Sequence, residues 1–203
     1  MRTGRVEAFS DGVFAIAITL LVLDLHVPAS DALTERLGSA LWAEWPTYAA
    51  YIVSFFVIGV IWINHHTVMD AIARVDKSLL VLNLGLLLTV VTIPFTTSLF
   101  AEYLREGSEA KLAAAIYSAV MVVHAVLWTV FWHHAAHHPE LLSADVDPDR
   151  ARRSVGRFSF GVPIYAVAVA LSFVNPYVVL ALHLFLALLY LRGMLDVGQE
   201  ANA

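Results

Sequence analysis

The hydrophobic positions of the chain fall into long runs that are separated by short polar connections. A predominantly apolar run of about 17–25 residues is long enough to cross the hydrocarbon core of a bilayer as an α-helix. The pattern therefore predicts an all-α integral membrane protein, a single domain over residues 1–203. Its six transmembrane helices are expected at about residues 6–27, 45–66, 78–100, 112–133, 158–174 and 176–192.

The first run differs from the others because it contains two carboxylates, Asp11 and Asp24. Twelve residues separate them, and at about 1.5 Å per residue they reach roughly 18 Å, less than the ~30 Å of the hydrocarbon core. If this helix spans a membrane, at least one carboxylate lies at membrane depth. A charge there faces water or protein, since facing lipid costs several kcal/mol.

A helical projection of the first run separates an aliphatic face from a polar one. With Ile16 at zero and about 100° per residue, Leu20 falls near 40° and Leu23 near −20°. Ser10 and Asp11 fall at roughly 120° and 220°, on the opposite side. We call Ile16, Leu20 and Leu23 the aliphatic ladder. Side chains of this kind commonly face lipid or pack in a bundle, and they can also line a pore.

Two polar side chains flank the ladder. Thr19 falls near −60° and offers a hydroxyl between the rungs. Asp24 falls near 80°, one turn above Leu20, where a carboxylate would attract cations to the outer mouth of a pore.

The distribution of Lys and Arg predicts the orientation in the membrane, because these residues concentrate in cytoplasmic connections. With six spans, one side carries three of them, Arg36, Arg105 and Lys111. The other side carries nine, Arg2, Arg5, Arg74, Lys77, Arg150, Arg152, Arg153, Arg157 and Arg192. We therefore expect both termini in the cytoplasm.

Polar groups of the first two spans are expected at the same cytoplasmic depth. Ser10 and Asp11 begin the first span, and the second ends with candidate partners, Trp62, Asn64, His65 and His66. Hydrogen bonds between these groups would hold the first helix at a fixed rotation. Asp11 could instead bind a permeant ion, although its position behind the ladder disfavours that role. Arg5 could neutralise Asp11 or face lipid headgroups.

Four histidines near residue 135 indicate a different possible function, that of a metal-dependent membrane enzyme. His133, His134, His137 and His138 form two i,i+4 pairs, a spacing suited to metal ligands. Together with His65 and His66 they are similar to the histidine boxes of membrane di-iron oxygenases, but only one box is complete. A solvated cluster at the membrane surface is the simpler interpretation, and a response to cytoplasmic pH is a minor hypothesis.

The composition excludes several other classes of protein. The chain is 60% hydrophobic and 14% charged, and it has no cysteine, which excludes disulfides and thiolate metal sites. Its net charge of −5 gives no reason to expect nucleic-acid binding. The first run shows no n-region, h-region and small-residue cleavage pattern before it, so we expect it to remain in the mature protein rather than to act as a signal peptide. A secondary transporter would favour paired interrupted helices, whereas only the third run has a central proline, Pro94.

Arg5, Phe9, Ser10 and Asp11 spell R-x-x-x-F-S-D, and GVFAIAITLLVLDL follows. This stretch resembles the first transmembrane helix of the transmembrane protein 175 family of potassium-permeable channels, in its prokaryotic six-helix form. The resemblance implies a pore lined by this helix in a homotetramer. It also implies that the motif bonds to neighbouring helices, that Ile16 forms the constriction, and that Leu20, Leu23 and Thr19 lie nearby.

We therefore expect a potassium-permeable cation channel in a bacterial inner membrane, surrounded by lipid and assembled from copies of itself. Monovalent cations would pass by passive conduction through a hydrophobic gate. Neither enzymatic activity nor a cofactor or metal is expected. A histidine-box oxidoreductase and a secondary transporter remain the alternative functions.

Overall fold

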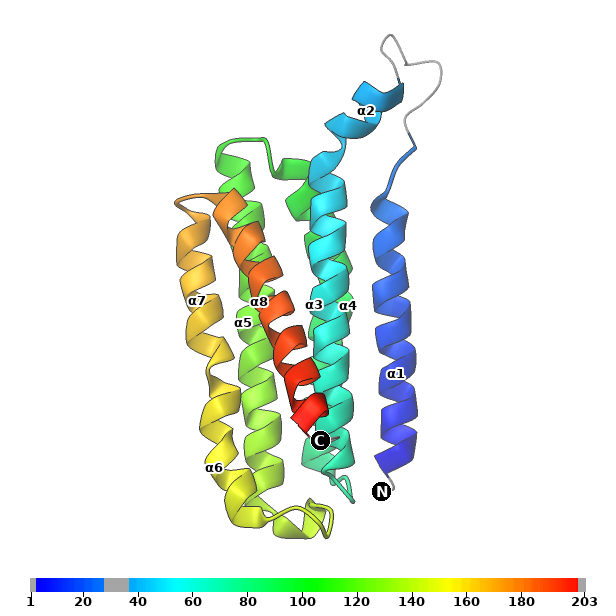
Figure 1. The fold of residues 1–203 in the computed structure, drawn as a ribbon, viewed down its shortest axis with the longest axis vertical. Coiled ribbons are helices and arrows are strands. Elements are labelled where there is room, and N and C mark those ends of the chain that lie inside the picture. Colours follow the sequence, from blue (N-terminus) through cyan, green and yellow to red (C-terminus); the bar gives the residue numbers. More distant parts are fainter. Residues whose placement is uncertain (1–2, 28–36, 201–203) are drawn as a thin grey trace.

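The computed structural model describes residues 3–27 and 37–200, with side chains up to residue 192. These residues form an all-helical bundle (Figure 1). Its main helices are α1 (Thr3–Leu20), α3 (Trp45–Asp70), α4 (Lys77–Tyr103), α5 (Ser108–His137), α6 (Pro148–Ser159), α7 (Gly161–Ser172) and α8 (Pro176–Glu200). Short helices η1 (Leu21–Asp24), α2 (Leu37–Ala43) and η2 (Pro139–Leu141) complete the described part.

Within the described ranges, five helical segments are long and apolar enough to cross a membrane. They are Thr3–Asp24, Trp45–Asp70, Lys77–Tyr103, Ser108–His137 and Pro148–Ser172. The apolar part of α8, Pro176–Arg192, is shorter. The described residues thus confirm an all-helical protein with long apolar spans, whereas the expected number of six spans stays a prediction. Arg2 and Arg36, which entered the orientation argument, lie outside the described residues.

Several helix boundaries differ from those expected. The helices α3, α5 and α8 end at Asp70, His137 and Glu200, later than the expected residues 66, 133 and 192. Two further differences concern the first and the fifth span. The α-helical part of the first run ends at Leu20, and a 3₁₀ turn follows over Leu21–Asp24. The fifth span was expected to begin near residue 158, whereas a helix already begins at Pro148. Its start follows local rules, because proline suits the first turn and the Asp147 carboxylate accepts a 2.9 Å hydrogen bond from the backbone N–H of Asp149.

The long α5 lies at the centre of the bundle and packs against α4, α6, α7 and α8. In contrast, α1 packs against α3 and α4 and stands at one edge (Figure 1). The start of α1 and the end of α8 lie at the same end of the bundle (Figure 1). The α3–α4 connection and α6 also lie there, and they contain much of the Lys and Arg. The position of α1 leaves one of its faces uncovered by the other described residues.

Candidate functional site

The first helix has one buried face and one exposed face. The exposed face includes the aliphatic ladder, with Ile16 60% exposed, Leu20 42% and Leu23 70%. The opposite face packs onto α3 and α4 through side chains that are at most 7% exposed, Val6, Ser10, Phe14, Ala17 and Leu21. The structure therefore places Ser10 and the ladder on different sides of α1, as the helical projection predicts.

Thr19 lies on the exposed face beside the ladder. Its hydroxyl lies 2.8 Å from the carbonyl oxygen of Ala15 and 2.9 Å from that of Ile16, and it donates to these acceptors within its own helix. A hydroxyl oxygen that donates its hydrogen in this way keeps lone pairs for another partner. Thr19 thus presents an acceptor oxygen on an otherwise aliphatic surface.

A chain of hydrogen bonds ties the buried face of α1 to α3 and α4. Asn83 Nδ2 donates to Ser10 Oγ at 3.0 Å, and Ser10 Oγ donates to the carbonyl oxygen of Val6 at 2.9 Å. Asn83 Oδ1 and His65 Nε2 are 2.8 Å apart. Because Oδ1 can only accept, the Nε2–H of His65 is the donor, which leaves Nδ1 without a proton in the neutral ring. His65 Nδ1 is buried with no hydrogen-bond partner among the described residues.

A second bond joins the first half of α1 to the second half of α3. Trp62 Nε1 donates to Asp11 Oδ1 at 2.9 Å. Of the partners expected for the Ser10–Asp11 pair, Trp62 thus meets Asp11 directly and His65 reaches Ser10 through Asn83. Asn64 has no side-chain hydrogen bond within the described part of the chain. Arg5 and Phe9 are exposed, and no ion pair of Arg5 occurs among the described residues.

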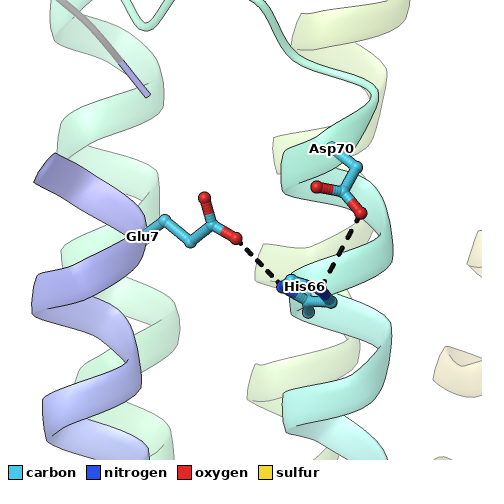
Figure 2. Close-up of side chains that lie close together, drawn as sticks. All are labelled: Glu7, His66 and Asp70. Atoms are coloured by element: carbon cyan, nitrogen blue, oxygen red, sulfur yellow. Dashed lines mark hydrogen bonds and ion pairs between the residues drawn. The ribbon is translucent and has the colours of Figure 1, made fainter. Parts of the chain in front are cut away.

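Glu7, His66 and Asp70 form a third contact between α1 and α3 (Figure 2). Glu7 Oε1 lies 2.9 Å from His66 Nδ1, and Asp70 Oδ2 lies 3.8 Å from His66 Nε2. The sequence contains a hint of this contact, since Glu7 lies one turn before Asp11 and His66 one turn after Trp62. That signal is weak, because carboxylates and histidines at helix ends are common.

Asp24, expected at an outer mouth, lies in η1 rather than in a continuing α-helix. Its Oδ2 accepts a 2.6 Å hydrogen bond from Ser98 Oγ of α4. A 3₁₀ turn rotates each residue by about 120° rather than 100°, so the projection that placed Asp24 near 80° does not hold beyond Leu20. The carboxylate is half-buried beside α4.

The four histidines near residue 135 do not form a cluster of three or more convergent ligands; within the described ranges only Glu7, His66 and Asp70 do. His137 Nδ1 and His138 Nδ1 each lie 2.8 Å from the carbonyl oxygen one turn earlier, that of His133 and that of His134. His134 Nε2 lies 2.8 Å from Asp76 Oδ2. These contacts belong to a helix end and its neighbouring loop, and His65 is held elsewhere, by Asn83.

Asp76 caps the start of α4 at this end of the bundle. Its Oδ1 accepts a 2.8 Å hydrogen bond from the backbone N–H of Leu79. Partial burial alone would raise the pKa of the Asp76 carboxyl, but the bonds from Leu79 and His134 outweigh burial and hold that pKa below its ordinary value.

Comparison with known proteins identifies the family. The family model described as endosomal/lysosomal potassium channel TMEM175 matches residues 5–94. A potassium channel of Streptomyces collinus is 50% identical over 188 residues, which cover 93% of this chain and 91% of that protein. The human endosomal/lysosomal proton channel TMEM175 is 34% identical over 143 residues, 65% of this chain and 28% of the human protein.

A solved structure is similar over nearly the whole chain. The crystal structure of a potassium-selective TMEM175 homologue from Chamaesiphon minutus is 39% identical and superposes with a TM-score of 0.82. The match covers 93% of this chain and 95% of that one. The chain belongs to the TMEM175 family.

Proposed function

We propose that the protein is a potassium-permeable cation channel, in which several copies surround a pore lined by the exposed face of α1. The observation that carries this proposal is the aliphatic ladder, which the chain's own bundle leaves uncovered although the opposite face of the same helix is buried. The Streptomyces and Chamaesiphon relatives, both named as potassium channels or potassium-selective, support the choice of ion.

A pore position also suits the polar groups of α1 better than exposure to lipid. Thr19 lies on the exposed side, and Asp24, in the turn that follows, is only half-buried. A carboxylate facing hydrocarbon would cost several kcal/mol. In a ring of copies these groups would meet water, and the membrane lipid would contact the outer helices. One subunit provides a single ladder, so closure of a ring requires at least three copies; we propose a homotetramer.

Ion passage through such a pore needs neither a chemical step nor a cofactor. Rings of aliphatic side chains close a pore by excluding water, and they provide no oxygen ligands for a dehydrated ion. We assign the narrowest ring to Ile16, with Leu20 and Leu23 above it. The Thr19 oxygens are the nearest polar ligands to that constriction, and permeant K⁺ would meet them between the rungs.

The proposed orientation places both termini in the cytoplasm of a bacterial cell, with the chain in the inner membrane. It is supported by the four arginines of α6, together with Arg74 and Lys77 where α3 connects to α4, since these segments lie at the end of the bundle where α1 begins. Asp24 would then lie at the outer end of the pore and Asp11 at the inner end.

The test is a flux assay on purified protein in liposomes under a potassium gradient, comparing wild type with Ile16→Asn. Val167→Asn is the matched control, because Val167 is 55% exposed on α7, which lies across the bundle from α1 (Figure 1). A polar ring lowers the barrier that dewetting imposes, so Ile16→Asn should raise potassium flux severalfold while Val167→Asn matches wild type.

Sodium and proton fluxes measured in the same vesicles identify the permeant ion. Potassium flux above sodium flux is expected. Absence of potassium flux in all three proteins would refute the channel, and equal effects of the two asparagine substitutions would refute the pore position of Ile16.

A further inference from the structure

The side chains of Glu7, His66 and Asp70 offer one ligand atom each within 4.8 Å of one another (Figure 2). They join the start of α1 to the end of α3, outside the ladder and outside the Ser10–Asn83–His65 chain. Their charges do not balance, since two carboxylates share one imidazole. No Lys or Arg of the described ranges forms an ion pair with either carboxylate, although the Glu7 side chain is only 26% exposed.

The hydrogen-bond geometry fixes the roles of the two ring nitrogens. At 2.9 Å from Glu7 Oε1, His66 Nδ1 must carry the hydrogen and donate it, because the carboxylate only accepts. Nε2 of the neutral ring then carries a lone pair, and it lies 3.8 Å from the Asp70 carboxylate oxygen, which is also an acceptor. Two acceptors that face each other across this distance leave space for a cation.

The distance fits a metal ion. For bonds of about 2.1 Å to imidazole nitrogen and carboxylate oxygen, a separation of 3.8 Å corresponds to an N–metal–O angle of about 130°. Imidazole with carboxylate suits zinc and similar divalent transition ions better than Ca²⁺ or Mg²⁺, which prefer oxygen ligands alone.

We propose that the protein binds a divalent transition-metal ion of the zinc class between His66 Nε2 and Asp70. Glu7 is the positioning residue, because its bond to Nδ1–H orients the imidazole in the way that second-shell carboxylates orient zinc-bound histidines. His66 also stacks on Trp62, with ring centroids 6.1 Å apart and planes at 19°. The metal is therefore bound by a side chain that stacks on Trp62, the donor of the bond to Asp11, and water completes its coordination.

The test measures zinc binding by isothermal titration of the full-length protein in detergent micelles, purified with a tag that contains no histidine. Wild type should bind one more equivalent of Zn²⁺ per chain than His66→Gln. Asp70→Asn should lose the same equivalent. Glu7→Gln should keep the stoichiometry with about 10–100-fold weaker affinity, the usual effect of removing a second-shell partner.

The surface histidines are the main source of unrelated binding. A variant with all four replaced by Gln, at His133, His134, His137 and His138, removes them and should retain the equivalent that depends on His66. Equal stoichiometry in wild type and His66→Gln would overturn the proposal, and that comparison decides even if the fourfold variant does not fold. Because no flux is measured, the result does not depend on the proposed channel function.

Discussion

The substitution Asn83→Leu tests whether the buried polar chain holds α1 against the bundle. Leucine has the same branched side-chain skeleton as asparagine but neither donates nor accepts a hydrogen bond, so His65 Nε2–H loses its acceptor and Ser10 Oγ loses its donor. Ser10 keeps its bond to the carbonyl of Val6, so only the imidazole is left unsatisfied. His65 is 1% exposed, and water therefore cannot replace the lost bond without a structural change.

The expected cost follows from those two bonds. An orphaned buried polar group costs about 1–3 kcal/mol, and interhelical hydrogen bonds measured in a membrane protein average about 0.6 kcal/mol, with a maximum near 1.7. Asn83→Leu should therefore lower the free energy of unfolding by about 1–3 kcal/mol, roughly 5–150-fold in the folding equilibrium. Ser10→Ala removes a single interhelical bond and should cost less.

The assay is denaturation in mixed detergent micelles, followed by tryptophan fluorescence. Thr92→Val is the matched control, because the Thr92 hydroxyl bonds only to a carbonyl of its own helix α4, that of Leu88. The double variant Ser10→Ala with Asn83→Leu should cost less than the sum of the single variants, since both remove the same bond. The argument fails if Asn83→Leu is as stable as Thr92→Val.

Three further predictions concern single groups near α1 and α4. Asp24→Asn should reduce potassium flux at low salt, and the reduction should shrink toward 1 M salt as screening shortens the range of the charge; a reduction independent of salt would contradict the assigned attraction. Trp62→Phe should lower the free energy of unfolding by about 0.6–1.7 kcal/mol through loss of the bond to Asp11. Asp11→Asn keeps an acceptor oxygen and should lower it less. A larger loss in Asp11→Asn than in Trp62→Phe would contradict the role of this hydrogen bond. The pKa of Asp76 is lowered on folding, so its ionised form stabilises the protein above the ordinary pKa of about 3.9. This contribution is lost as the pH falls through the lowered pKa, and the melting temperatures of wild type and Asp76→Asn should converge there; a constant difference from pH 7 to pH 3 would refute it.

The sequence was sufficient to predict the bundle and the two faces of α1, because both depend on regular periodicity. Apolar runs of membrane length have few alternatives to helices. From Ser10 to Leu20 the rotation per residue is constant, so a helical projection of the sequence alone places Ser10 and Ile16 on different faces of α1. The same projection does not extend to Asp24, because the hydrogen bonding over Leu21–Asp24 changes to the 3₁₀ pattern. No residue type in that turn predicts the change.

The partners of the motif were harder to predict than its position. Trp62 and His65 were candidates because the second span ends at the depth where the first begins. Asn83 was not among the predicted partners, although it is the only amide in the run 78–100. The depth of a residue along its span does not show which helix provides the side chain between Ser10 and His65. The Glu7–His66 contact was missed for a similar reason: its register depends on how far α1 slides along α3, which packing alone determines.

The anchors of α1 restrict how the proposed pore can open. The Asn83–Ser10 bond lies one to two turns before Ile16, and the Asp24–Ser98 bond lies just after Leu23, so the helix is fixed on both sides of the ladder. Rotation of the whole helix by the half-turn needed to exchange its two faces would break both bonds and would expose Phe14 and Ala17 in place of Ile16. Tilting about the Ser10 end stretches the Asp24–Ser98 bond but leaves the Asn83–Ser10 bond in place, so it breaks one of the two bonds rather than both. If Ile16 forms the constriction, the less costly route to a wider ring is therefore a tilt of α1 with its motif end held in place.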